Sequence, residues 1–150
     1  MKLNFEVEID AALDVVWAAF TDPDNMGRWV QNFESFTPKT GDPGQTGASA
    51  EIIFNENGKR VAMLETITER RDPDFLAASY ETDHGTTVIV QHFETIDENR
   101  TRWSSWCRFT LTGFMRLITW FVSCVVRKRT EGDMQRFKLM VESDLAGSGT

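Results

Sequence analysis

The sequence predicts an α+β protein with seven strands, two short helices and one long C-terminal helix. Through most of residues 2–111, short segments alternate apolar and polar residues and are separated by turn residues. This pattern is typical of half-buried strands joined by hairpins. The last part of the chain, Gly113–Ala146, indicates a single helix that begins at a glycine and ends before a short glycine-containing tail. The expected order is a strand, two short helices, six strands and the long helix.

The first strand and the two short helices open the chain. Apolar residues at positions 3, 5, 7 and 9 alternate with polar ones, which predicts a strand with one buried face. Asp10 is the expected cap of the first short helix. Asp22 is the expected cap of the second, with Pro23 in its first turn, where a missing N–H costs no hydrogen bond. Trp29 ends this second helix.

A hairpin is predicted at Asn57-Gly58, because both residues accept the positive φ angles of a type I′ turn. The glycines and proline of residues 40–47 indicate a loop before it. The predicted register of this hairpin pairs Phe54 with Val61, Ile52 with Met63, and Ala50 with Glu65.

Three later turns set the rest of the sheet, at Asp72-Pro73-Asp74, at Asp83-His84-Gly85 and about Glu98-Asn99. The last of these turns predicts that Glu94 lies opposite Trp103 and His92 opposite Ser105. A slip of one residue would move every one of these side chains to the other face. The expected inner face of these strands also holds Leu76, Ala78, Tyr80, Val88, Val90, Cys107, Phe109 and Leu111.

The long helix has an apolar stripe that changes character along its length. Its second half places Met134, Phe137 and Val141 on one face, but the same face in the first half holds Thr119 and Ser123. Two interpretations follow. Either the helix kinks or starts late, near Arg127 to Gly132, and its first half is simply buried. Or it is straight, its polar residues line a cavity, and its outer apolar surface meets a partner or a membrane.

Length and composition predict one globular domain, residues 1–146, and a flexible tail, residues 147–150. The N-terminus alternates like a strand and does not resemble a signal peptide. Cys107 and Cys124 both lie among apolar residues and are expected to be small buried thiols of a reducing compartment. A cytoplasmic location is therefore expected.

The net charge of −7 is unevenly distributed along the chain. Residues 1–99 contain 7 Lys and Arg against 19 Asp and Glu, whereas residues 100–130 contain 7 basic residues and no acidic ones. The acidic bulk argues against nucleic acid as a partner. The basic segment coincides with the apolar start of the long helix, which is a combination that anionic membrane surfaces and acidic proteins attract.

Several short motifs resemble the START-like or Bet v 1-like (SRPBCC) superfamily, in its polyketide cyclase/dehydrase branch. They are Ile9-Asp10-Ala11-Ala12, Val16-Trp17, Asp22-Pro23 and Trp29 near the start, and Gly113-Phe-Met-Arg-Leu and Thr130-Glu-Gly-Asp-Met-Gln-Arg-Phe-Lys in the last helix. Ala12 departs from the proline that is usual there. The resemblance implies a helix-grip fold, an antiparallel seven-stranded sheet curled around the C-terminal helix with a cavity between them. Members of the superfamily bind lipids, sterols, hormones or polyketides, and some are enzymes.

The expected cavity combines apolar and aromatic side chains with a few polar groups, as small-molecule sites do. One interpretation makes His92, Glu94, Glu65 and Tyr80 the acid-base groups of a cyclase or dehydratase, since His titrates near neutrality. The other makes them a buried polar network whose members satisfy one another. We expect ligand contacts from Phe54, Met63, Tyr80, His92, Trp103, Ser105, Thr119 and Ser123.

No cofactor or metal is expected, because the histidines and cysteines show no ligand spacing and the glycines form no phosphate loop. The leading functional hypothesis is binding of a hydrophobic small molecule, lipid or polyketide-like. The alternatives are a cyclase/dehydratase-type enzyme and a docking module for a membrane or protein that uses Phe114, Phe121, Val125 and Arg127-Lys128-Arg129. A homodimer would use Trp106 or Phe121. The ligand and the oligomeric state stay open.

Overall fold

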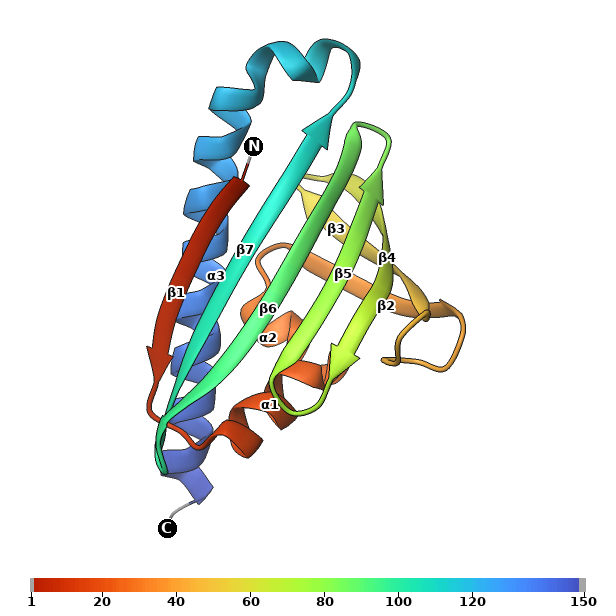
Figure 1. Ribbon diagram of the computed structural model, residues 1–150. Coiled ribbons are helices and arrows are strands. Elements are labelled where there is room, and N and C mark those ends of the chain that lie inside the picture. Colours follow the sequence, from red (N-terminus) through yellow and green to blue (C-terminus); the bar gives the residue numbers. More distant parts are fainter. Residues whose placement is uncertain (1, 149–150) are drawn as a thin grey trace.

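Figure 1 shows a computed structural model of the chain, which describes residues 2–148. One antiparallel sheet contains seven strands in the order β1-β7-β6-β5-β4-β3-β2. The strands are β1 (Lys2–Ile9), β2 (Phe33–Thr40), β3 (Ser49–Glu56), β4 (Lys59–Arg71), β5 (Phe75–Thr82), β6 (Gly85–Asp97) and β7 (Arg100–Leu111). The helices are α1 (Leu13–Thr21), α2 (Met26–Trp29) and α3 (Thr119–Ser148), with 3-10 segments η1 (Pro23–Asn25) and η2 (Gly113–Ile118).

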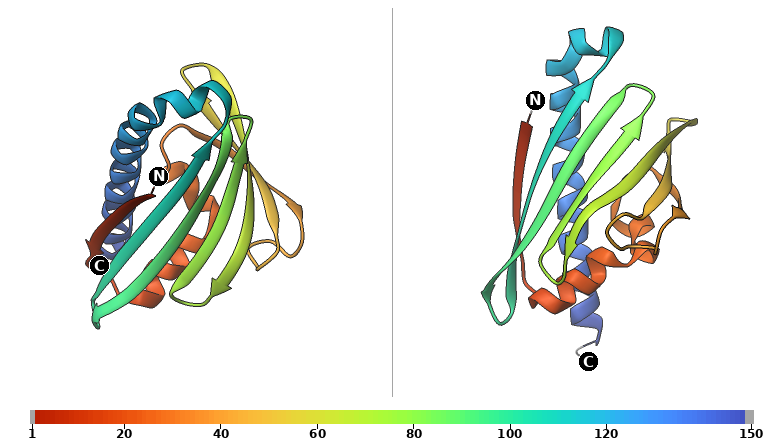
Figure 2. Two further views of the ribbon diagram at one scale, coloured as in Figure 1. Left: turned by 45° about the horizontal axis from the view of Figure 1, so that its top comes forward. Right: turned by 45° about the vertical axis from the view of Figure 1, so that its right-hand side comes forward.

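The sheet curves, and the helices lie on its concave side (Figure 2). Helix α3 runs beside β1 and packs mainly on β1 and α2, while α1 packs against β6 and β7. The predicted element order and helix-grip architecture are confirmed.

The long helix is continuous from Thr119 onward and passes through Gly132 without a break. A helix that starts only near Arg127 to Gly132 is therefore wrong, and so is the expected burial of its first half, where Trp120 and Phe121 are exposed. The helix also starts later than Gly113, since Gly113–Ile118 forms a 3-10 segment. Gly147 and Ser148, expected in the tail, belong to the helix, and the remaining tail residues, 149–150, lie outside the described residues.

The two expected caps have different outcomes. Asp22 does cap the second short helical segment, because its Oδ1 accepts a hydrogen bond of 2.9 Å from the backbone N–H of Asp24. Asp10 does not cap α1, whose N-cap is Ala12 and has no side-chain hydrogen bond. The backbone N–H of Asp10 instead donates to Oε2 of Glu142, which ties the end of β1 to α3.

The Asn57-Gly58 hairpin has the predicted register, with Phe54 opposite Val61, Ile52 opposite Met63 and Ala50 opposite Glu65. Asn57 and Gly58 have φ angles of 56° and 89°, which are the positive values that this turn requires. The local turn chemistry was sufficient to place these side chains.

The predicted register of β6 on β7 is wrong by one residue. Asp97 pairs with Arg100 as the turn requires, but the pairing then shifts between Thr95 and Asp97, so that Thr95 lies opposite Thr101. This β-bulge leaves Ile96 as an extra residue in β6 and turns the rest of the strand over. Phe93 therefore lies opposite Trp103, and Gln91 opposite Ser105.

An aromatic cluster joins the sheet to the second half of α3. Phe137 is fully buried, and its ring centroid lies 5.1 Å from that of Trp103 and 5.1 Å from that of Trp29, both edge-on. Phe93 stacks on Trp103 at 5.5 Å. Aromatic pairs in these geometries stabilise a core beyond the burial of their area. The clamped part of the helix is thus its second half.

We predict that Phe137→Ala lowers the free energy of unfolding by about 3–5 kcal/mol, because it removes the centre of this cluster and leaves a cavity. Leu139→Ala is the matched control, since Leu139 lies two residues away on the same helix and is 61% exposed. Its effect should stay within about 0.5 kcal/mol. Urea denaturation measures both effects. Equal effects of the two substitutions would contradict the role of the aromatic cluster in holding α3 to the sheet.

Candidate functional site

A group of half-buried side chains lies on the concave side of β3, β4 and β5, apart from the aromatic cluster. We call it the inner surface, and it consists of Phe54, Val61, Met63, Glu65 and Tyr80. None of these residues belongs to the main hydrophobic core, which is built from β1, β6, β7, α1 and α3. Because α3 packs mainly on β1 and α2, it leaves the inner surface partly open.

The polar centre of the inner surface is a pair of side chains on neighbouring strands. Glu65 and Tyr80 lie directly opposite each other in the β4–β5 register, and the Tyr80 hydroxyl donates a hydrogen bond of 2.8 Å to Oε2 of Glu65. Among residues 2–148, Glu65 forms no ion pair with a Lys, Arg or His. The carboxyl group thus has one neutral hydrogen-bond partner in mostly apolar surroundings.

Burial determines the titration of both groups. It raises the pKa of Glu65 above its usual value, and the hydrogen bond from Tyr80 offsets part of that rise. Burial, together with the adjacent carboxyl group, raises the pKa of Tyr80 well above its usual value, so the phenol stays protonated at neutral pH. The pair therefore offers a hydroxyl and a carboxyl group that holds its proton more strongly than an exposed one.

Arg129 of α3 reaches across to the end of β3 at one side of the inner surface. Its guanidinium pairs with Glu56, donates to the backbone oxygen of Gln31 at 2.8 Å, and lies 5.2 Å from the ring centroid of Phe54. These contacts tie the helix to the far side of the sheet. They also place a paired cation beside the apolar part of the inner surface.

The expected polar side chains on α3 form hydrogen bonds within the protein, and the one on β7 is buried. The hydroxyls of Thr119 and Ser123 donate to the backbone oxygens of Arg116 and Trp120, at 2.8 and 2.6 Å. Ser105 is buried beside Trp103 on the inner side of β7. The serine and threonine hydroxyls of the helix thus return to its own backbone, as such residues often do within helices.

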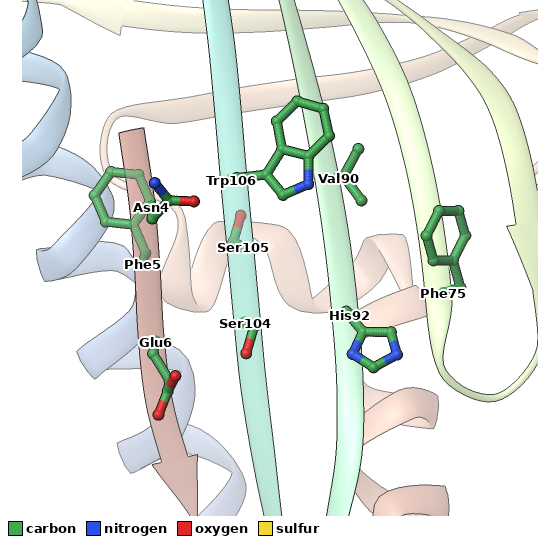
Figure 3. A pocket seen from close by; sticks show the side chains of 9 residues that line it. All are labelled: Asn4, Phe5, Glu6, Phe75, Val90, His92, Ser104, Ser105 and Trp106. Carbon is green, nitrogen blue, oxygen red and sulfur yellow. The ribbon is translucent and has the colours of Figure 1, made fainter. Parts of the chain in front are cut away.

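His92 and Glu94 do not lie on the inner face, contrary to our expectation. The bulge at Ile96 turns both side chains outward, where Glu94 pairs with Arg102 at 3.4 Å. Figure 3 shows His92 on the outer face of the sheet, beside Trp106 and Ser104. They line an open hollow of about 370 Å³ with Asn4, Phe5, Glu6, Phe75, Val90 and Ser105.

Gln91 is the inward-facing polar residue of β6 that the sequence analysis missed. Its Oε1 accepts a hydrogen bond of 2.7 Å from Nε1 of Trp103. The sequence did contain a signal for the inward position of Gln91. Moving the register by one residue places the apolar Phe93, in place of the charged Glu94, opposite the buried Trp103. The expected four-residue acid-base group is thus divided, with Glu65 and Tyr80 inside and His92 and Glu94 outside.

Within residues 2–148, no group of three or more His, Cys, Asp or Glu side chains is arranged to hold a metal ion. None of the helices in that range is both long and apolar enough to span a bilayer. Cys107 is buried as expected, whereas Cys124 is exposed on α3, and both are free thiols.

Solved structures with the same fold are numerous, and their sequences differ greatly from this one. The protein TTHA0849 from Thermus thermophilus is 18% identical, with a TM-score of 0.79 over 96% of this chain and 99% of that one. Ara h 8.0201 is 15% identical, with a TM-score of 0.79 over 95% and 98%. The ZhuI aromatase/cyclase from Streptomyces sp. R1128 is 13% identical, with a TM-score of 0.81 over 95% and 93%. At these identities the likeness shows the fold alone.

The family comparison is more specific than the structural one. A search of curated proteins finds no match to this chain. The family model described as polyketide cyclase / dehydrase and lipid transport matches residues 1–140. Because that match spans nearly the whole chain, the protein belongs to the polyketide cyclase/dehydrase and lipid transport family.

Proposed function

We propose that the protein binds a hydrophobic small molecule, lipid or polyketide-like, on its inner surface. The observation that carries this proposal is the Glu65–Tyr80 pair, which lies among half-buried apolar side chains and has no charged partner among the described residues. Small-molecule sites combine a mostly apolar lining with a few polar groups that orient the ligand. Phe54, Val61 and Met63 supply the apolar part.

The chemistry of the pair indicates which ligands would fit. The oxygen atoms of Tyr80 and Glu65 retain lone pairs that can accept a hydrogen bond from a ligand hydroxyl, and the carboxyl can donate to a ligand carbonyl only in its protonated form. A negatively charged ligand group at this position would be repelled by the ionised Glu65 carboxylate. The proposal therefore favours an apolar compound with one neutral hydroxyl or carbonyl group.

An acid-base role in a cyclase or dehydratase reaction is a second candidate, and the raised pKa of Glu65 is what favours it. Glu65 and Tyr80 would be its groups, because His92 and Glu94 lie on the opposite face of the sheet. Compounds recovered from the wild type and from Glu65→Gln distinguish the two functions. Products that differ by the elements of water would support the enzyme, and identical compounds would support binding alone.

Compounds that copurify with the protein test the proposed binding. Denaturing the purified chain and analysing the released molecules by mass spectrometry should yield a stoichiometric apolar compound. Nile red, which is neutral and has a carbonyl group, should bind the protein and be displaced by that compound. If neither bound, an inner-surface site for a hydrophobic molecule would be contradicted.

Substitutions of two adjacent residues on opposite faces of β4 test where Nile red binds. Met63→Asp should weaken Nile red binding about tenfold or more, because it places a charge among the apolar side chains that would contact the probe. Leu64→Asp makes the same charge change on the outer face, where Leu64 is 38% exposed, and should leave binding unchanged. If Met63→Asp does not fold, Tyr80→Phe, which keeps the aromatic ring, takes its place in the binding test. Equal losses from both aspartate variants would place the probe elsewhere.

The titration of Glu65 makes the stability of the protein depend on pH. Because the folded-state pKa of Glu65 is raised, the folded protein holds this proton more tightly than the unfolded chain does. This contribution to stability is fully present below the unfolded value, about 4.3, and is lost as pH rises through the folded one. Glu65→Gln removes that loss, so the variant should gain stability relative to the wild type as the pH rises above the unfolded value of about 4.3.

Thermal melts at a series of pH values measure this difference. Glu81→Gln is the matched control, since Glu81 follows Tyr80 on β5 and is exposed on the outer face. Its difference from the wild type at each pH is the baseline for that of Glu65→Gln. A constant difference between Glu65→Gln and the wild type would show that the Glu65 carboxyl titrates alike in the folded and unfolded states.

A further inference from the structure

The first turns of the C-terminal helical region expose an unusual group of large apolar side chains. We call this group the apolar tip, and it consists of Phe114, Leu117, Trp120, Phe121 and Val125. Their exposed fractions are 73, 80, 74, 62 and 52%. Soluble surfaces commonly carry single exposed apolar residues, but a contiguous group of this kind marks an interaction site.

The backbone brings these residues together on a projecting corner. Gly113, with a φ of +61°, turns the chain out of β7 into η2. Spacings of three and four residues then place Leu117 beside both Trp120 and Phe121, and Phe121 beside Val125. The corner formed by η2 and the start of α3 extends past the ends of the neighbouring strands (Figure 1).

The charges beside the apolar tip are basic. Arg116 lies within η2, and Lys128 follows Val125 by three residues on the exposed side of α3. Neither side chain takes part in an ion pair formed within residues 2–148. By contrast, Arg127 pairs with Glu131, and Arg129 pairs with Glu56.

Acidic residues are absent from the sequence between Arg100 and Thr130, although residues 1–99 are strongly acidic. One acidic residue, Asp83, lies at the base of the corner, on the turn whose His84 backbone oxygen accepts a hydrogen bond from the N–H of Thr112. The projecting part of the corner therefore combines aromatic side chains with unpaired positive charge.

We propose that the apolar tip docks on the surface of a membrane that contains anionic lipids. Trp and Phe side chains enter the interface between headgroups and acyl chains, and nearby Lys and Arg are attracted by anionic headgroups. A second copy of the chain fits less well, because pairing two tips would bring Arg116 and Lys128 of both copies together. The helix lies on the membrane and does not cross it, in keeping with its limited apolar length.

This inference is independent of ligand binding, because it rests on other residues. The inner surface and the apolar tip are nevertheless connected in the fold. Tyr80 lies two residues before Thr82, and the Thr82–Gly85 turn is hydrogen-bonded to Thr112 at the base of the tip. Docking would therefore bring the end of the sheet that holds Tyr80 toward the lipid.

Vesicle flotation of the full chain tests the proposal. The protein should float with vesicles of phosphatidylcholine and phosphatidylglycerol, and much less with phosphatidylcholine alone or at high salt. The double variant Trp120→Ser, Phe121→Ser should bind the anionic vesicles about tenfold more weakly or worse. Leu139→Ser, which alters an exposed leucine of the same helix outside the tip, should bind like the wild type. Equal binding by all three proteins would overturn the proposal.

The basic residues provide a second arm. Arg116→Gln and Lys128→Gln should each weaken binding to the anionic vesicles about fivefold, which corresponds to the ~1 kcal/mol expected for one cation near an anionic surface. Lys39→Gln removes a cation from β2, away from the tip, and should have little effect. If all three substitutions weakened binding equally, overall charge would be responsible and the proposed site would be wrong.

Trp120 also reports directly on its surroundings. Its emission should shift to the blue when anionic vesicles are added, and Trp120→Phe, which keeps an aromatic ring, should float but lose most of that shift. Sedimentation of the protein without vesicles tests whether the apolar tip binds a second copy of the chain instead. A dimer that dissociates in the Phe121→Ser variant, together with no vesicle binding by the wild type, would show self-association and overturn membrane docking.

Discussion

The packing of Phe137 of α3 against Trp103 and Trp29 is the contact on which the rest of the structure depends. It holds the second half of the helix to one side of the curved sheet, where most of the core lies. The first half is attached by the partly buried Val122 and Val126 and by the Arg129–Glu56 pair. This asymmetry leaves the inner surface partly open on one side of the helix and the apolar tip exposed on its other side.

The change in helix polarity follows from the same asymmetry. Where the sheet clamps the helix, the inward stripe is apolar and includes Met134, Phe137 and Val141. Toward the N-terminal end the inward positions are Thr119 and Ser123, whose hydroxyls bond to their own helix. The outward-facing apolar residues there, Trp120, Phe121 and Val125, are exposed and add nothing to the core. A contiguous group of exposed apolar side chains marks an interaction site.

The fold could be predicted because most of its signals are local. The alternation of β1, the Asp22 cap and the Asn57-Gly58 turn each depend on a few neighbouring residues, and the structure shows all three. Glu65 and Tyr80 were placed correctly by the same turn chemistry and alternation. The placement of His92 and Glu94 failed, because the turn about Glu98-Asn99 alone does not show the bulge at Ile96, which moves Phe93 to the buried position. By contrast, a single helix through Gly132 was among the predictions, because one glycine lowers helix preference only weakly.

The bulge at Ile96 also bears on how related proteins are compared. A single inserted or deleted residue near the Glu98-Asn99 turn would restore or remove the shift, and would exchange Phe93 and Gln91 for His92 and Glu94 on the concave side. Relatives with the same fold are only 11–19% identical to this chain. In an alignment of such sequences, the position of one gap therefore decides which residues of β6 are assigned to the interior.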